Sequence, residues 1–411
     1  MTTLAGLLAT VFDRRYVGSA AGDRRDIVTL CKGLMAARDE VTGMDLARRV
    51  LDRYGALDAA ARAGFFGWLA QALEIETGEV AAALAEYSAD PTPLAHATLM
   101  AASEPPRQDL FRRLNRVPGA TGRLVDMRAD LRRAAASDPA LTVVDADLSH
   151  LLRSWFNRGF LVLRPVNWDS PASLLQKIIE YEAVHTIDSW DDLRRRLQPA
   201  DRRCFAFFHP AMPDEPLIFV EVALTRGIPG AIDALLAEGR APLDVGAADT
   251  AVFYSISNCQ PGLAGVSFGN LLIKQVVADL TAEVPGLRTF VTLSPIPGLS
   301  DWMTEAGMVP DGDAALRQAA AHYLTRVRRG DRPRDPVARF HLSNGATIHD
   351  LHAGADTSDA GMAQSHGAMV NYLYDPDRIG RNLEELTKGR IPASRAVQAL
   401  ARQVQIPEDA S

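Results

Sequence analysis

The periodicity of the chain changes once, near Leu141, and this change restricts the possible architecture more than any other feature. Before it, apolar residues recur three and four positions apart, and no strand-like alternation of any length appears. One such series is Ala47, Val50, Leu51 and Tyr54. After it, short runs rich in aromatic and β-branched residues alternate with helix-like segments. Helices and strands bury one face with these two periods. The sequence therefore predicts an α+β protein, with an all-helical bundle in 1–145 and a mixed α/β domain in 146–411.

Residues that favour helix starts refine this outline. Thr42 and Asp58 can each cap a helix of the first region, and Ser189 can cap one in the second. Ser170 precedes Pro171, which suggests a serine cap with proline at the first helical position. In the second region, two apolar runs flank a proline-rich connection at 210–216, which is typical of a hairpin.

Composition narrows the class of protein. The 411 residues are 47% hydrophobic and 23% charged, which is enough for an ordinary core without a structural metal or disulfide. The net charge of -7 argues against a nucleic-acid partner. Cysteines occur only at 31, 204 and 259, too far apart for a disulfide framework or a zinc motif, so we expect a reducing compartment. No apolar run approaches the ~20 residues that span a bilayer, and neither end carries a secretory or peroxisomal signal. We therefore expect a cytoplasmic protein that does not bind membranes.

The segment from Ala251 to Asn270 carries the most chemical information. A strong strand runs into a loop with Gly262, Gly265 and Gly269, and the loop opens a helix. Glycines let backbone N–H groups approach a ligand, and a helix N-terminus favours anions, so the segment could hold a pyrophosphate. A tight strand-to-helix turn that needs glycine is the alternative. A Walker loop does not fit, because Gly269 is not followed by the lysine that such a loop requires.

The same glycines also match a nucleophile elbow, since residues 265–269 read G-x-S-x-G. That motif requires a strand that leads directly into its serine, and here Pro261-Gly262 intervenes. We therefore disfavour a hydrolase.

Two further positions draw attention. Ser294 ends an apolar strand and precedes Pro295, so its hydroxyl can point into a cleft or make a local turn hydrogen bond. His341 lies between bulky apolar residues, where a lone histidine is usually structural. His349 and His352 have no third ligand at a telling spacing, so we predict no metal site.

Several motifs in the same order resemble the malonyl-CoA decarboxylase family. They are Tyr181–His185, Glu215–Leu217 with Val222–Leu224, Phe253–Ser257, Gly265–Lys274, Leu293–Gly298, Phe340–Leu342 with Asn344–Ala346, and Asn371–Tyr374. The resemblance spans about residues 148–375, and the helical N-terminal region fits in kind.

The resemblance implies a catalytic domain with the fold of GCN5-related N-acetyltransferases (GNAT). It implies Ser294 and His341 as the catalytic pair, with Tyr374 and Ser267 lining the same pocket. It also implies that the glycine loop binds the CoA pyrophosphate. The loop residues are Ala264, Gly265, Val266, Ser267, Phe268, Gly269 and Asn270.

The resemblance further implies that the chain converts malonyl-CoA to acetyl-CoA and CO2 through a thioester enolate. No cofactor is expected, because the thioester carbonyl is itself the electron sink. A homo-oligomer, a dimer or a tetramer, is expected through the N-terminal helices. Two alternatives stay open: an acyl-CoA N-acyltransferase of the same fold, and a catalytically silent CoA-binding scaffold.

Overall fold

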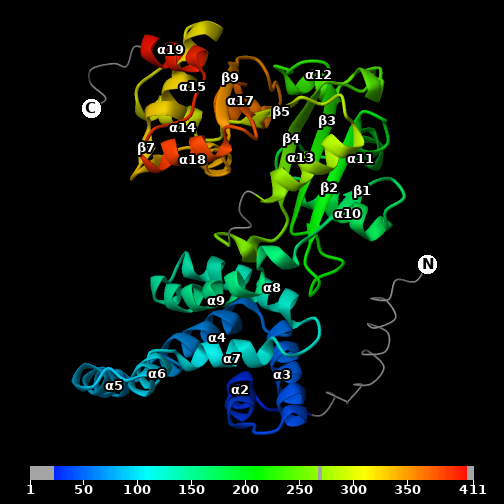
Figure 1. Cartoon of the computed structure of the whole chain (residues 1–411). Coiled ribbons are helices and arrows are strands. Elements are labelled where there is room, and N and C mark those ends of the chain that lie inside the picture. The colour runs from blue at the N-terminus through cyan, green and yellow to red at the C-terminus, as the bar shows by residue number, and fades with distance from the viewer. Residues whose placement is uncertain (1–22, 267–270, 405–411) are drawn as a thin grey trace. The chain divides into compact units, whose positions relative to one another are not determined.

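The computed structural model describes residues 23–266 and 271–404, and these form two compact units (Figure 1). The first, called here the helical unit, comprises 23–160 together with 210–213 and 260–266. The second, the sheet unit, comprises 161–209, 214–259 and 271–404. The expected boundary at 145/146 falls inside helix α9 (Thr142–Trp155), which belongs to the helical unit as a whole.

Helices make up the helical unit, as the spacing of apolar residues predicts. Those that precede α9 are α2 (Ile27–Ala36), α3 (Glu40–Gly55), α4 (Ala59–Ala72), α5 (Thr77–Ala89), α6 (Pro93–Ala102), α7 (Pro106–Leu114) and α8 (Ala120–Ala135). The Asp58 cap of α4 is confirmed, since its side chain accepts from the Ala61 N–H. The Thr42 cap is wrong: Asp39 caps α3 and accepts from the Thr42 N–H.

A mixed sheet organises the second unit. Its strands are β1 (Val162–Val166), β2 (Arg202–Phe208), β3 (Ile218–Thr225), β4 (Thr250–Asn258), β5 (Thr289–Thr292), β6 (Ser294–Pro295), β9 (Thr347–His352) and β10 (Met369–Leu373). The order of the eight strands in the described residues is β1-β2-β3-β4-β5-β10-β6, with β9 also paired to β10. The predicted β2–β3 hairpin is confirmed by its antiparallel register. Strands β4 and β5 run parallel, whereas the other pairs of this sheet are antiparallel.

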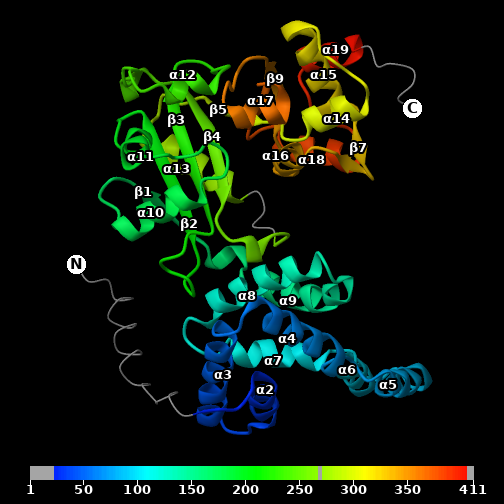
Figure 2. The same cartoon turned by 180° about the vertical axis from the view of Figure 1, so that it is seen from behind.

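Helices cover both faces of this sheet. They are α10 (Ala172–Tyr181), α11 (Trp190–Leu197), α12 (Ile232–Leu236) and α13 (Leu271–Glu283). Apolar side chains of α10 and α11 pack on β1 to β3, and those of α12 pack on residues of β3, β4 and β5. Helix α13 lies on the opposite face, as the two views show (Figures 1 and 2). The predicted Ser189 cap of α11 is confirmed. The Ser170 cap of α10 is wrong, because Pro171 occupies the cap position and the Ser170 hydroxyl accepts from the Asn167 N–H instead.

The C-terminal part of the sheet unit adds helices around β9 and β10. They are α14 (Leu299–Glu305), α15 (Gly312–Arg326), α16 (Pro336–Ser343), α17 (Asp359–Ser365), α18 (Ile379–Thr387) and α19 (Arg395–Gln403). A small hairpin, β7 (Arg328–Arg329) with β8 (Arg332–Pro333), follows α15. The predicted α+β class is confirmed by the helical unit followed by the mixed sheet. Among the described residues, no helix combines the length and the apolar character needed to cross a membrane.

Candidate active site

Ser294 lies where two strands of the sheet separate. Strand β5 follows β4 in parallel register up to the pair Phe253 and Thr292, and the Leu293 N–H still donates to the Phe253 carbonyl at 3.0 Å. Beyond this point β4 continues beside β3, whereas Ser294 and Pro295 pair with β10. Pro295 has no N–H to offer a neighbouring strand. The apolar strand β5 ends at Thr292, two residues earlier than predicted, and Ser294 instead begins the short strand β6.

His341 comes from the last turn of α16. Asp335 caps this helix, accepting from the Ala338 N–H at 2.7 Å, and Pro336 occupies the first helical position. These two local signals fix where α16 starts and therefore which way His341 points. His341 is 3% exposed.

Ser294, His341 and Tyr374 form one hydrogen-bonded cluster, called here the Ser-His-Tyr cluster. The Ser294 Oγ lies 3.2 Å from the His341 Nε2, and the Tyr374 Oη lies 2.8 Å from the His341 Nδ1. All three side chains are buried. His341 is 47 residues from Ser294 and 33 residues from Tyr374 in the sequence, so only the tertiary fold brings the three side chains together.

Burial sets the protonation state of the cluster. It lowers the pKa of His341 to about 3, because the charged imidazolium is poorly solvated there. It raises the pKa of Tyr374 well above its ordinary value for the same reason. At neutral pH the imidazole is therefore uncharged and the phenol keeps its proton. A neutral imidazole has one N–H and one acceptor nitrogen, so it can pass a proton between its two partners.

Two further residues, which were not predicted from the sequence as site residues, contact the Ser-His-Tyr cluster. The Tyr372 ring stacks on the His341 ring with centroids 4.4 Å apart. The Thr292 Oγ1 accepts a hydrogen bond from the Ser294 hydroxyl at 2.9 Å. A spacing of two was the available signal in the sequence, since Thr292 precedes Ser294 by two positions and Tyr372 precedes Tyr374 by two.

Part of the predicted pyrophosphate loop lies in the helical unit. The described residues Ala264, Gly265 and Val266 follow a 3-10 turn, and Gly265 has a φ of 78°, which favours glycine. Arg128 of α8, which is buried, donates to the carbonyls of Gly262 and Ala264 at 2.7 and 2.9 Å. Ser267, Phe268, Gly269 and Asn270 lie outside the described residues.

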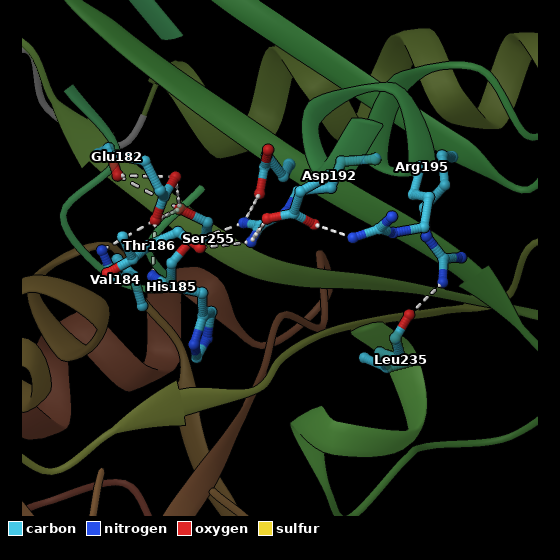
Figure 3. A network of polar contacts seen from close by, with 12 residues as sticks. Glu182, Val184, His185, Thr186, Asp192, Arg195, Leu235 and Ser255 are labelled. Atoms are coloured by element: carbon cyan, nitrogen blue, oxygen red, sulfur yellow. Dashed lines mark hydrogen bonds and ion pairs between the residues drawn. The ribbon is translucent and has the colours of Figure 1, made fainter. Parts of the chain in front are cut away.

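A second polar cluster explains one motif that resembles the family. Glu182, from the Tyr181–His185 motif, has both carboxylate oxygens near the Ser255 Oγ, at 2.8 and 2.7 Å (Figure 3). The same carboxylate accepts from the N–H groups of Val184 and His185, at 2.8 Å each. The motif therefore ties the end of α10 to strand β4.

A buried contact between an arginine and a glutamic acid side chain adjoins this second cluster. Arg196 lies 3.3 Å from Glu221 and also donates to the His185 carbonyl at 2.8 Å. Glu221 is fully buried, and burial raises its pKa to about 8.

Histidines 349 and 352 do not assemble a metal centre in the described part of the chain. The His352 Nε2 lies 2.5 Å from the Asn371 Oδ1, which occupies one of its ring nitrogens. Within 23–266 and 271–404, no three His, Cys, Asp or Glu side chains are grouped so as to hold a metal ion.

Comparison with known proteins places the chain in a family. Residues 74–156 match the malonyl-CoA decarboxylase N-terminal domain, and 159–316 with 311–410 match the C-terminal domain of the same name. Mitochondrial malonyl-CoA decarboxylase of Rattus norvegicus is 34% identical over 415 residues, covering 86% of this chain and 84% of the relative. The Anser anser anser enzyme is 35% identical over 350 residues, covering 72% and 69%.

Two solved structures resemble this protein along nearly the whole chain. Malonyl-CoA decarboxylase from Agrobacterium vitis has a TM-score of 0.87 and 47% identity, and covers 92% of this chain and 99% of its own. The protein from Rhodopseudomonas palustris has a TM-score of 0.85 and 46% identity, with 91% and 98% covered. The family domains, the relatives and the structures all point one way, and the chain belongs to the malonyl-CoA decarboxylase family.

Proposed function

We propose that this chain converts malonyl-CoA to acetyl-CoA and CO2, with Ser294 and His341 as its catalytic pair. The observation that carries the proposal is the buried contact between the Ser294 Oγ and the His341 Nε2, at 3.2 Å. Membership of the family supplies the substrate, and this contact supplies groups that can handle the proton.

The chemistry needs little more than such a pair. When CO2 leaves, the electron pair of the broken C–C bond forms an enolate with the thioester carbonyl. A donor aimed at a developing oxyanion can be worth about 2.7–4 kcal/mol in a preorganised site. The Ser294 hydroxyl, which the N–H of the neutral His341 supports from behind, provides a donor for that purpose. The enolate carbon then takes one proton, which Ser294 delivers and which solvent restores to the cluster afterwards.

His341 is suited to this step because it is coupled on both sides. Serine alone is too weak an acid to protonate carbon efficiently, whereas a serine coupled to an imidazole can replace its proton at once. The Tyr374 hydroxyl, 2.8 Å from the His341 Nδ1, completes the path. General acid–base catalysis of this kind contributes about 10²–10⁴-fold in rate.

The proposal includes the CoA loop, the assembly state and the compartment. The loop Ala264–Asn270 binds the CoA pyrophosphate, which the positive φ of Gly265 supports. The helical unit forms a homo-oligomer, because α5 and α6 carry the exposed apolar residues Leu84, Leu94 and Met100. The three cysteines are free and buried, in keeping with a cytoplasmic enzyme. Leu94→Glu is expected to lower the mass measured by light scattering, and an unchanged mass would contradict this interface.

The decisive test is release of CO2 from malonyl-CoA with no amine present. Wild type should turn over, and Ser294→Ala and His341→Asn should lose most of kcat while CoA affinity changes little. His322→Asn is the matched control, because His322 belongs to the same unit but stacks on Trp302. Turnover that requires an amine would indicate an acyltransferase, and CoA binding without any turnover would indicate a scaffold. Equal loss of CoA affinity in His341→Asn would assign that residue to binding.

A further inference from the structure

Thr292 connects the Ser-His-Tyr cluster to strand β10. It is the last residue of β5, it is fully buried, and its Oγ1 accepts from both the Ser294 hydroxyl, at 2.9 Å, and the Tyr372 N–H, at 3.2 Å. Its carbonyl accepts from the Asn371 Nδ2 at 2.9 Å. Both the backbone carbonyl and the side chain of Thr292 are therefore bound to strand β10, so its hydroxyl has little freedom to move.

The direction of one hydrogen bond decides the others. A serine hydroxyl has a single proton, and Ser294 donates that proton to Thr292. Towards His341, Ser294 therefore presents a lone pair, so the Nε2 must be the donor across the 3.2 Å contact. A neutral imidazole carries one N–H, which leaves the Nδ1 as an acceptor for the Tyr374 hydroxyl. The protons of the Ser294 hydroxyl, the His341 ring and the Tyr374 hydroxyl then each have one acceptor.

The opposite direction leaves a buried proton without a partner. If the Nδ1 carried the hydrogen, the Tyr374 oxygen would accept it, and the phenol proton would need another acceptor. Among the described residues, the Tyr374 hydroxyl makes its hydrogen bond to His341 and has no second partner that could accept its proton. A buried hydroxyl that donates to nothing is unfavourable by about 1–3 kcal/mol.

We propose that Thr292 is a positioning residue that holds His341 in the Nε2–H tautomer, with this N–H directed at Ser294. The inference rests on the proposed function, since it assigns a direction to the same Ser-His-Tyr cluster. Thr292 acts through Ser294 and does not itself touch the substrate. In this state the imidazole faces Ser294 as a proton donor and not as a base, which is the polarity that protonation of an enolate requires.

Thr292→Val tests the proposal, because valine resembles threonine in shape but cannot accept a hydrogen bond. The Ser294 proton is then free to turn to the Nε2, which would move the ring proton to the Nδ1. We expect kcat to fall about 10–100-fold, part of what acid–base catalysis supplies, while KM for malonyl-CoA stays within about twofold. Thr292→Ser keeps the acceptor and should retain kcat within about threefold.

A control separates positioning from loss of folding. Thr325 is a buried threonine of α15 in the same unit, and its hydroxyl donates to the Ala321 carbonyl. Thr325→Val removes a comparable hydroxyl outside the cluster and should leave kcat unchanged. Equal kcat losses in Thr292→Val and Thr325→Val, or a wild-type kcat in Thr292→Val, would overturn the proposal.

The tautomer can be measured without turnover. In the full chain labelled with ring-15N histidine, the His341 signals are identified by their loss in His341→Asn. Wild type should show a protonated Nε2 and an unprotonated Nδ1, and Thr292→Val should show the reverse or an average of both. A wild-type spectrum with the proton on the Nδ1 overturns the inference, even if Thr292→Val does not fold. Failure of wild type to release CO2 would instead refute the proposed function and leave the spectrum as an independent result.

Discussion

Replacing Arg128 by methionine removes the side chain that anchors the start of the glycine loop. The Arg128 side chain is 2% exposed, and its guanidinium pairs with Asp145 at 2.8 Å and donates to the carbonyls of Gly262 and Ala264. Methionine fills a similar volume without any donor. Both loop carbonyls lose a charged partner, and such hydrogen bonds contribute about 1.5–3 kcal/mol each.

The loss of stability in Arg128→Met depends on whether the partners left behind can bind water instead. Breaking a buried ion pair by removing one side costs about 3–5 kcal/mol. Asp145 keeps 23% of its side chain exposed and regains water, so we expect about 3 kcal/mol, the lower end of that range. A domain with about 5–15 kcal/mol of stability survives this loss, but the loop held by Arg128 is released.

If the loop binds CoA, its release raises KM for malonyl-CoA. With 1.4 kcal/mol per tenfold change, a loss of about 3 kcal/mol permits an increase of about 100-fold, and we expect about 10–100-fold. The expected change in kcat is within about threefold, because the Ser-His-Tyr cluster is untouched. Steady-state kinetics at saturating and limiting malonyl-CoA separate the two constants.

Arg107→Met is the matched control for this prediction. Arg107 is also a buried arginine of the helical unit, paired with Asp147 and donating to the Leu73 carbonyl at 3.3 Å. Arg107→Met should lower Tm by about as much as Arg128→Met does, because each loses a buried ion pair, but it should leave KM for malonyl-CoA unchanged. The reasoning is refuted if Arg128→Met loses stability like the control but keeps the wild-type KM.

Three further outcomes are expected. Gly262→Ala should lower Tm by about 4–10 °C in calorimetry, because its Cβ would lie 1.9 Å from the Val125 carbonyl oxygen. Gly64→Ala, an open helical position, should not lower it, and equal Tm values for the two variants would contradict the clash. Burial raises the pKa of Glu221 to about 8, so its stabilising contribution is full below the unfolded pKa near 4.5 and is lost as pH rises towards 8. The Tm of Glu221→Gln, relative to that of wild type, should therefore be higher at pH 8 than at pH 5. A Tm difference that does not depend on pH would disprove this. Tyr374→Phe should lower kcat about tenfold or more with little change in KM, and normal kcat would remove Tyr374 from the proton path.

Local physical signals account for what the sequence predicted well. Asp58 and Ser189 cap helices because a short polar side chain reaches an N–H three residues away, and that distance is set by the chain itself. The same rule failed at Thr42 and Ser170, where a competing residue, Asp39 or Pro171, occupies the cap. The prolines that follow Ser294 predicted it at the end of the apolar strand, which instead ends two residues earlier, at Thr292.

The sequence by itself determined the order of the elements, the change from helices to a mixed sheet, and the resemblance that drew attention to His341. Its immediate neighbours, bulky and apolar, indicated only a structural histidine. The tertiary structure alone decided that Ser294, His341 and Tyr374 meet, that Thr292 receives the serine proton, and that Arg128 holds a loop 134 residues away. Local signals extend over about one helical turn, whereas these contacts exist only after distant segments have packed together.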